Sequence, residues 1–368
     1  MIVPQQGTSD PSRPVLAVSM GDPLGIGPEV VAKAINQWGG RQSVRLHVYG
    51  QPEPLRAAAA RAAIPLPPFQ VTTPGRIDPA AEIVVVADPA WPVLSRTTPS
   101  DDRAAGEISY QSVLAAISAC KLPADAAGAA MAICTAPISK KAWFLAGHGR
   151  YPGHTELLDE HFRDASTPEE DRAVMFFLGP RLKLVLVTVH VPLARVPVLL
   201  TREAIVHATR LGVVACQRLG TSRPRVAVCG LNPHAGEQGL LGTEDETVIV
   251  PAVEDLRSRG IDARGPLSAD SVFLDAVKPA ARGGGKFDLF VAMYHDQGLI
   301  PVKLLDRDES VNVTLGLAAA GREIVRTSPA HGTAFDIAGR NSADPSSMIA
   351  AMDAAVRLVG VTPQTHLS

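Results

Sequence analysis

Short apolar runs alternate along the chain with turns rich in glycine and proline and with stretches of helical periodicity. Runs made almost entirely of Val, Ile and Leu predict strands buried on both faces, which is typical of a parallel sheet covered by helices. The expected strands are 15–20, 44–49, 82–86, 129–134, 182–189, 226–229 and 289–294, and the expected helices include 29–36 and 110–120. This alternation of strands and helices predicts the α/β class.

The chain has 368 residues, 46% of them hydrophobic and 20% charged, which is enough for about two domains with large cores and no disulfides. A change of character near 134–142, reversed near 311, predicts a first domain from 1–135 plus 311–368 and an inserted second domain from 136–310. None of the cysteines forms a C-x-x-C pair and all lie in apolar stretches, so buried reduced thiols are expected. They are Cys120, Cys134, Cys216 and Cys229.

The formal net charge is −2 and no long run carries one sign, which argues against nucleic acid or an anionic membrane surface as the main partner. Residues 1–13 contain no apolar core of a secretory signal, and no apolar stretch approaches the length that crosses a membrane. We therefore expect a soluble cytoplasmic protein that meets an anionic substrate with a few placed cations.

Three of the predicted strands are followed by a histidine. The run 182–189 ends directly before His190, 226–229 leads through a short turn to His234, and 289–294 precedes His295. Because ligands bind at the carboxyl ends of parallel strands, a parallel arrangement would bring the three imidazoles to one edge of the sheet. Three neutral imidazoles with one open position form a catalytic site for a divalent metal, with Zn²⁺ the first candidate.

Each histidine taken alone is more often a hydrogen-bonded residue at a strand end than a metal ligand, and the long spacings match no short zinc signature. Only the three together indicate a metal. Such ligands are also compatible with Mg²⁺, Mn²⁺ and Co²⁺. The polar turns 235–237 and 296–298 could supply groups that orient the ligands.

A glycine-rich turn, 21–29, separates the first predicted strand from the first predicted helix, and Pro28 suits the first turn of that helix. Its backbone N–H groups could bind an anion, but a tight strand-to-helix turn explains the pattern equally well. The turn matches neither G-x-G-x-x-G nor a Walker A pattern. Further along the chain, Lys303 and Arg326 would hold a phosphate or carboxylate if they converge, with Asn312, on the metal.

Six motifs then occur in the order found in a known family. They are Gly-Asp-Pro-Leu-Gly-Ile-Gly-Pro-Glu (21–29), Thr-Ala-Pro-Ile (135–138) with Lys140, Tyr-Pro-Gly-His-Thr-Glu (151–156), Gly-Leu-Asn-Pro-His-Ala-Gly-Glu (230–237), Tyr-His-Asp-Gln-Gly (294–298) and Arg-Thr-Ser-Pro-Ala-His-Gly-Thr-Ala-Phe-Asp-Ile-Ala-Gly (326–339). Together they resemble the 4-hydroxythreonine-4-phosphate dehydrogenase family of vitamin B6 synthesis and its close relatives. The resemblance covers nearly the whole chain after the first dozen residues.

The resemblance implies a fold like that of the isocitrate and isopropylmalate dehydrogenases, with two α/β/α domains and a cleft between them. It also implies a homodimer with the active site at the subunit interface and with metal-binding histidines from both chains. His190, His234 and His295 match the metal ligands of the family. The three strand ends therefore need not meet within one chain.

The resemblance also assigns substrate and cofactor contacts. The residues that match substrate contacts are His154, Thr155, Lys303, Asn312 and Arg326. The segment 331–339 is similar to the cofactor loop of isopropylmalate dehydrogenases, and it begins with His331, Gly332, Thr333 and Ala334. The implied cofactor is NAD, with NADP left open. Asp270 is a candidate acid, base or amine-binding group.

Three departures from the family pattern bear on these assignments. Ser139 stands where the family usually has Asn, and Leu24 stands where it usually has Ala. Residues 318–325 are additional, and they make the alignment of Arg326 compete with that of Arg322.

The implied reaction is the metal-dependent, NAD-linked oxidation of 4-phosphohydroxy-L-threonine to the 3-oxo acid, which loses CO₂ to give 3-amino-2-oxopropyl phosphate. An alternative within the same superfamily is oxidation of 4-phospho-D-threonate or 4-phospho-D-erythronate in sugar-acid catabolism. The retained motif 151–156 and Arg326 disfavour a cyclic dihydrodiol substrate. More remote alternatives are a metal-dependent hydrolase, which would leave the segment 331–339 unexplained, and a non-catalytic binding protein.

Overall fold

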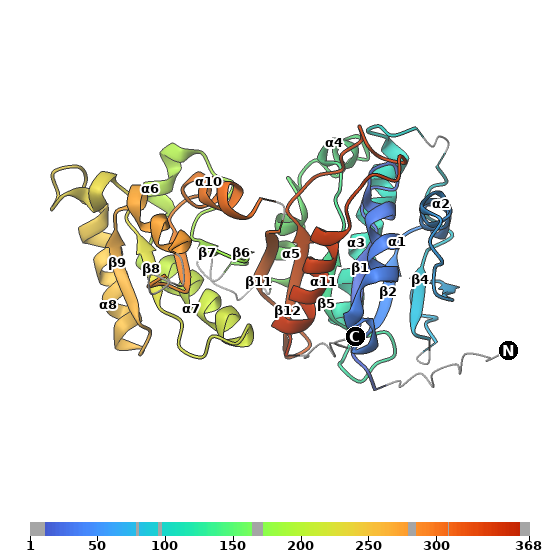
Figure 1. Cartoon of the computed structure of the whole chain (residues 1–368), viewed down its shortest axis with the longest axis horizontal. Helices are drawn as coiled ribbons and strands as arrows, with labels where there is room; N and C mark the ends of the chain where they lie inside the picture. Colours follow the sequence, from blue (N-terminus) through green and yellow to red (C-terminus); the bar gives the residue numbers. More distant parts are fainter. Residues whose placement is uncertain are drawn as a thin grey trace. The chain divides into compact units, whose positions relative to one another are not determined.

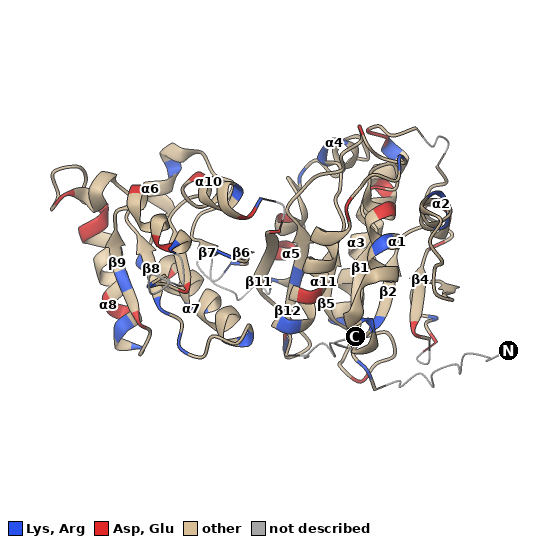
Figure 2. Ribbon diagram, viewed as in Figure 1, with Lys and Arg blue, Asp and Glu red and all other residues tan. Residues whose placement is uncertain are grey.

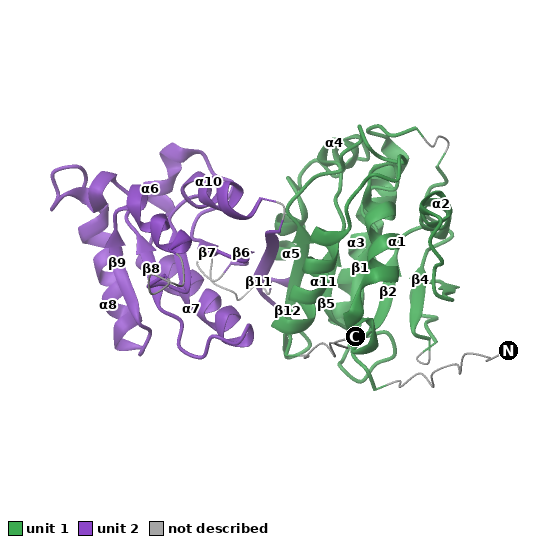
Figure 3. Cartoon of the chain, in the orientation of Figure 1, with its two compact units in different colours: residues 1–161, 318–368 green, residues 162–317 purple. Residues whose placement is uncertain are grey.

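The chain divides into two compact units (Figure 3): unit 1 is Met1–His161 with Ala318–Ser368, and unit 2 is Phe162–Leu317. The structure, a computed structural model, describes residues 12–78, 81–94, 98–163, 172–278, 285–307 and 309–360. Unit 1 runs to His161 rather than to 135, and resumes at Ala318 rather than at 311, so its boundaries lie later than the approximate ones expected from the sequence. Consequently the motif 151–156 belongs to unit 1.

The strands of unit 1 are parallel and lie in the order β3-β4-β2-β1-β5-β12 (Figure 1). Their bounds are β3 Gln70–Thr72, β4 Ile83–Val86, β2 Arg45–Tyr49, β1 Val15–Ser19, β5 Ala130–Thr135 and β12 Arg322–Pro329. Every residue of β1, β2 and β4 is buried, as expected for strands covered on both faces. The apolar runs of the sequence therefore predict β1, β2, β4 and β5, but not β3 or β12.

Helices cover the sheet of unit 1. They are α1 Gly27–Gln37, α2 Pro52–Ala62, α3 Arg103–Lys121, α4 Lys140–Leu145, α5 His154–Phe162 and α11 Ser346–Leu358, with a 3-10 turn at Gly39–Gln42. Helix α3 packs against β1 and β5, and α11 packs against β5 and β12. Asp102 caps α3 by accepting hydrogen bonds from the backbone N–H groups of Ala104 and Ala105, which explains why this helix begins where it does.

The strands of unit 2 lie in the order β11-β6-β7-β10-β8-β9. Their bounds are β11 Val311–Ala319, β6 Val174–Leu178, β7 Lys183–Leu186, β10 Leu289–Ala292, β8 Val226–Cys229 and β9 Ala263–Leu267. Strands β7, β10, β8 and β9 are parallel, whereas β6 is antiparallel to both β7 and β11. The parallel arrangement expected from the apolar runs therefore holds for β7, β10, β8 and β9, whereas β6 and β11, which the sequence does not predict, pair with each other in antiparallel fashion.

Two helices sandwich the parallel strands of unit 2. Helix α7, Arg202–Arg218, brings Gly212 against Leu289 and Val185, whereas α10, His295–Asp306, brings Gly298 against Leu184 and Leu186. Because neighbouring residues of a strand point to opposite faces, α7 and α10 lie on opposite sides of the sheet. The remaining helical segments are α6 Val196–Leu199, α8 Val250–Ser258, α9 Ala269–Val272, 3-10 turns at Leu193–Arg195, Pro233–Gly236 and Phe273–Val277, and a π-helical turn at Asp245–Ile249.

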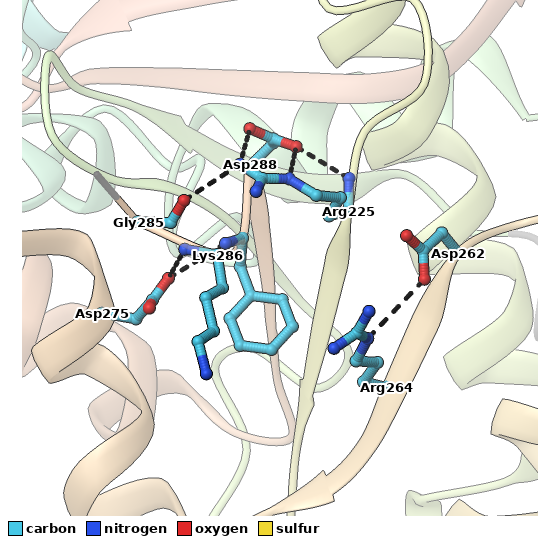
Figure 4. A network of polar contacts seen from close by, with 8 residues as sticks. Arg225, Asp262, Arg264, Asp275, Gly285, Lys286 and Asp288 are labelled. Carbon is cyan, nitrogen blue, oxygen red and sulfur yellow. Dashed lines mark hydrogen bonds and ion pairs between the residues drawn. The ribbon is translucent and has the colours of Figure 1, made fainter. Parts of the chain in front are cut away.

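Ion pairs fix the amino-terminal edge of this parallel sheet (Figure 4). Arg225, directly before β8, donates through its guanidinium and its backbone N–H to the carboxylate of Asp288, directly before β10. Nearby, the carboxylate of Asp275 accepts hydrogen bonds from the backbone N–H groups of Lys286 and Phe287 at 2.6 and 2.9 Å. These contacts hold β8 and β10 in register at the edge opposite the histidines.

Charges of both signs are interspersed over the helices and loops of each unit (Figure 2), in agreement with the small net charge of the sequence. In the described part of the chain, no helix combines the length and apolar character needed to cross a bilayer. All four cysteines are free and buried, as expected, and burial raises the pKa of each thiol to about 12.

A buried histidine makes the stability of unit 1 sensitive to acid. His47 on β2 is fully buried, and neither ring nitrogen has a hydrogen-bond partner in the described structure. Burial, reinforced by the neighbouring charge of Arg45, lowers the pKa of His47 from 6.5 to about 4. The unfolded chain therefore binds a proton below pH 6.5 that the folded chain does not bind until about pH 4, so stability falls across this window as the pH is lowered.

We expect this linkage to lower the free energy of unfolding by about 2 kcal/mol between pH 7 and pH 5. Urea unfolding of the wild type and of His47→Leu at the two pH values measures the effect, because the leucine variant lacks the titrating group. An equal loss of stability in both proteins would assign the acid sensitivity to other residues.

Candidate active site

Two of the three predicted metal ligands lie together at the carboxyl edge of unit 2. Strand β10 pairs in parallel with β7 on one side and with β8 on the other, so the three strand ends that precede the histidines share an edge. The rings of His190 and His295 are 5.6 Å apart between centroids. Nδ1 of His295 is 2.7 Å from Oδ1 of Asp296, a contact that orients the ring and leaves Nε2 as the nitrogen available to a metal.

His234 does not complete a metal site within one chain. Among the described residues, no group of three His, Cys, Asp or Glu side chains is arranged to hold a metal. His234 lies in a loop in which the six consecutive residues 234–239 all have positive φ. Four of these residues are not glycine, and each such left-handed residue costs about 1 kcal/mol or more unless its surroundings hold it.

A buried carboxylate binds the backbone just before this loop. Asp245 is fully buried and accepts hydrogen bonds from the backbone N–H groups of Leu231 and Asn232 at 2.9 and 3.0 Å, and from the side-chain amide of Asn232 at 3.0 Å. Glu244 accepts a second hydrogen bond from the same amide at 2.8 Å. The segment that leads to His234 is therefore fixed by acceptors on the first residue of the π-helical turn and on the residue before it.

Gln297 joins the His234 loop to the helix that carries His295. Its side-chain oxygen accepts a hydrogen bond from the backbone N–H of Met293, and its side-chain nitrogen donates to the backbone oxygen of Gly230, both at 2.7 Å. Asp296 and Gln297 thus make the kind of contact expected of the turn 296–298, which is predicted to orient the histidines. Neither Asp245 nor the specific contacts of Gln297 could be inferred from the sequence.

Asp270 lies on α9, close enough to His234 to interact with its charge. A hydrogen bond from Ser268, 2.8 Å long, is the main cause that holds the pKa of Asp270 below its usual range. Asp270 is therefore an anion at neutral pH, which suits binding of a cation better than donation of a proton.

Two further predicted contacts lie in unit 2. Lys303 is exposed on α10, the helix that begins at His295. Asn312 is half-buried on β11, and in the described structure its buried side-chain oxygen has no hydrogen-bond partner. The predicted metal ligands, Asp270, Lys303 and Asn312 therefore belong to one compact unit.

The remaining predicted substrate contacts lie in unit 1, around a buried arginine. Arg326 on β12 is 3% exposed, and its Nε and Nη2 donate to the hydroxyl of Thr135 at 2.9 and 2.6 Å. Burial lowers the pKa of Arg326 to about 10, so the guanidinium remains charged at neutral pH. A buried cation whose hydrogen-bond partner among the described residues is a neutral hydroxyl is suited to bind an anion.

Arg322, the other candidate for the substrate-binding arginine, has a different environment from Arg326. Arg322 donates to the backbone oxygens of Cys120 and Leu122 at the end of α3, which is a structural contact. The additional segment 318–325 forms the end of β11, a two-residue turn and the start of β12. Ala320 and Gly321 in this turn have φ values of 50° and 72°, a pair of left-handed residues typical of a tight turn between strands.

His154, the first residue of α5, lies close to this arginine. Burial is the main cause that lowers the pKa of His154 well below its usual value, and the charges of Arg326 and Lys140 add to it. The ring is therefore neutral, and its Nε2 has no hydrogen-bond partner in the described structure. Trp143 packs edge-on against the ring at 5.6 Å, and Thr155 follows in the first turn of the helix.

The predicted cofactor loop lies against the glycine-rich turn. The backbone oxygen of Thr333 accepts a hydrogen bond from the N–H of Ile26 at 3.0 Å, and a Cβ at Gly25 would approach Thr333 to 3.0 Å. The N–H groups of Leu24 and Gly25 donate to Asp22. Because the N–H groups of Leu24, Gly25 and Ile26 already have acceptors, the turn anchors the loop, and these three amides are not free to bind an anion.

Asp22 itself is a buried carboxyl that the sequence reasoning did not single out. It is fully buried, and burial is the main cause that raises its pKa to about 6.

Ser139, which stands where the family usually has Asn, caps α4: its side-chain oxygen accepts a hydrogen bond from the backbone N–H of Ala142, and its hydroxyl donates to Asp101. A serine fulfils here the capping role that an asparagine would also serve.

A cavity of about 540 Å³ opens beside this turn within unit 1. Leu24, Gly25 and Leu94 form part of its apolar lining, and Gly339, at the end of the predicted cofactor loop, borders it. Its size and apolar walls are typical of a site for a small molecule or for part of a cofactor. His331 and Gly332 do not line it.

The chain is similar to known proteins over nearly its whole length. The family model described as pyridoxal phosphate biosynthetic protein PdxA matches residues 42–355. The 4-hydroxythreonine-4-phosphate dehydrogenase of Xanthobacter autotrophicus is 41% identical over 348 residues, which are 93% of each chain. The crystal structure of 4-hydroxythreonine-4-phosphate dehydrogenase from Klebsiella pneumoniae is 34% identical with a TM-score of 0.71, over 94% of this chain and 99% of that one.

A relative with a different named activity has the same fold. The terephthalate 1,2-cis-dihydrodiol dehydrogenase of Burkholderia xenovorans is 30% identical with a TM-score of 0.63, over 95% of this chain and 99% of that one. The fold and these relatives thus define an α/β dehydrogenase. Within that class, the chain belongs to the pyridoxal phosphate biosynthetic PdxA family, which confirms the resemblance seen in the motifs.

Proposed function

We propose that the chain catalyses the metal-dependent, NAD-linked oxidation of 4-phosphohydroxy-L-threonine, and that the 3-oxo product loses CO₂ to give 3-amino-2-oxopropyl phosphate. Family membership supports the reaction class. The observation that carries the substrate assignment is the buried, charged Arg326 beside the neutral ring of His154. Such a pair binds one anionic end of a small phosphorylated acid through charge and hydrogen bonds.

His190, His234 and His295 are proposed as the metal ligands, and their chemistry fits a divalent ion. The proximity of His190 to His295 and the contact between His295 and Asp296 support the assignment. A divalent ion bound there would polarise a substrate oxygen and lower the pKa of a hydroxyl group. Zinc is the proposed ion, although magnesium, manganese and cobalt also accept such ligands.

This chain's own side chains would position the substrate. Arg326 would neutralise an anionic group, and His154 and Thr155 would hydrogen-bond to it from the start of α5. From unit 2, the exposed Lys303 would bind a second anionic group and Asn312 would offer its unpartnered oxygen to a donor. The anionic Asp270 is proposed to bind the substrate's amino group, a role that a sugar acid does not require.

We propose that the site is completed in a homodimer. Large apolar side chains that are more than half exposed lie on the segments that follow His190, His234 and His295. They are Leu193, Val198, Leu240, Ile300 and Leu304. Exposed apolar side chains gathered on the segments that carry the metal ligands are typical of a subunit interface. A second copy of the chain would cover these side chains, and its histidines would complete the set of three imidazoles that one chain does not bring together in the described structure.

NAD is the proposed cofactor, with NADP as the alternative. The segment His331, Gly332, Thr333 and Ala334 would lie against its adenosine part, and the cavity bordered by Gly339 is large enough for that part. The proposed location of the enzyme is the cytoplasm, where the nicotinamide pool is available to it.

The leading alternative substrates are 4-phospho-D-threonate and 4-phospho-D-erythronate, which lack the amino group. A dihydrodiol is less suited, because Arg326 and His154 are both present and favour a compact anion. The similarity to dehydrogenases over nearly the whole chain argues against the metal-dependent hydrolase considered from the sequence, which would need no nicotinamide.

The test is NADH formation by the metal-loaded protein, with 4-phosphohydroxy-L-threonine and 4-phospho-D-threonate compared side by side. We expect the amino acid to have the higher kcat/KM, and Asp270→Asn to lower that preference. Preference for the sugar acid would move the enzyme to sugar-acid catabolism, and turnover of neither would overturn the substrate assignment.

A further inference from the structure

We infer that Gln297 and Asp245 are positioning residues that hold the two ligand segments of unit 2, those of His295 and His234, in place before a metal binds. The inference rests on the proposed metal site and extends it to residues that touch neither metal nor substrate. It concerns how the chain prepares the geometry of its imidazoles.

Gln297 contacts the backbone at the exits of two strands. Met293, which donates to its side-chain oxygen, lies between the end of β10 and His295. Gly230, which accepts from its side-chain nitrogen, is the first residue after β8, on the way to His234. One amide side chain therefore fixes the separation of two segments that each carry a ligand. The amide accepts at one end and donates at the other, whereas an ionised carboxylate in its place could only accept.

Asp245 performs the same task for the segment before His234. Each of its carboxylate oxygens accepts a backbone N–H, one from Leu231 and one from Asn232. The approach is so close that a Cβ at Gly230 would lie 2.7 Å from Oδ1 of Asp245. The run of left-handed residues begins at His234, so the carboxylate fixes the backbone directly before the strained part of the loop.

The opposite edge of the same sheet provides matched controls (Figure 4). Arg225 joins the amino-terminal ends of β8 and β10 through Asp288, as Gln297 joins their carboxyl ends. Asp275 is buried and accepts two backbone N–H groups, as Asp245 does. Variants at these positions remove comparable contacts from unit 2 far along the strands from the histidines.

The experiment measures the zinc dissociation constant of the full-length protein by competition with a chromogenic chelator. Gln297→Glu keeps the acceptor for Met293 and loses the donor to Gly230, and Asp245→Asn replaces one acceptor oxygen with a donor. We expect each variant to weaken zinc binding by about 10- to 100-fold. Arg225→Met and Asp275→Asn should leave it within about twofold, although all four variants lower the urea midpoint. At saturating zinc, the kcat of Gln297→Glu should recover to within a few-fold of wild type.

Unchanged zinc affinity in Gln297→Glu and Asp245→Asn would overturn the inference and leave the proposed metal site standing. An equal weakening in the controls would also overturn it, because the effect would then follow general loss of stability. Failure of the wild type to bind zinc would overturn the proposed metal site, and the positioning role with it.

Discussion

Replacement of Arg326 by Met is expected to lower kcat/KM for the phosphorylated substrate by about a thousandfold, equivalent to roughly 4 kcal/mol of transition-state binding. The reason is that the guanidinium is buried and charged, so its attraction for an anion is little screened by water. Most of the loss should appear in KM if the anion is bound equally before and during the reaction. Steady-state NADH formation with each variant measures both constants.

The matched control is Arg322→Met. Arg322 binds backbone oxygens at the end of α3, so its loss should change kcat/KM by less than about threefold. The wild type should also be inhibited by inorganic phosphate competitively with substrate, and Arg326→Met should lose that inhibition. A large loss of activity in Arg322→Met with normal activity in Arg326→Met would reverse the assignment of the two arginines.

Replacement of His295 by Ala is expected to lower turnover at least about a thousandfold and to abolish tight zinc binding. His295 is the proposed ligand with the best-defined environment, since its ring lies 5.6 Å from that of His190 and its Nδ1 contacts Asp296. Removing it leaves too few imidazoles for a stable site. Zinc content after dialysis and the rate of NADH formation are the two measurements.

The control for this experiment is His207→Ala. His207 lies on α7 in the same unit, where its ring contacts the backbone oxygen of Arg172 at 3.0 Å. The His207→Ala variant should bind zinc and turn over substrate as the wild type does. Normal zinc content in His295→Ala would remove this residue from the proposed ligand set, whatever happens to activity.

The parts of the fold that could be predicted are those in which a strand is buried along its whole length. The predicted strand 226–229 is identical to β8, and 129–134 differs from β5 by one residue at each end. Strand β6 is apolar but is not among the predicted strands. Its antiparallel direction follows from the short turn between it and β7. Strand β9 contains Gly265 and Pro266, which reads as a loop, although a strand at the edge of a sheet tolerates proline.

The candidate site could be predicted as a set of motifs but not as a geometry. The order of β7, β10 and β8 confirms that the strand ends before the three histidines share an edge, whereas their joint binding of a metal stays a prediction. The loop of His234 takes a left-handed path through non-glycine residues, which no local propensity predicts. The segment before it is held by Asp245, a carboxylate whose partners become apparent only in three dimensions.

The burial of the four cysteines gives each unit its own internal reporter of opening. Cys120 and Cys134 lie in unit 1, and Cys216 and Cys229 lie in unit 2. With thiol pKa values near 12, the folded protein presents almost no thiolate to an alkylating reagent or an oxidant at neutral pH. Modification must therefore wait for a unit to unfold locally, so the labelling rate of each pair records how often that unit opens and whether substrate or metal slows it.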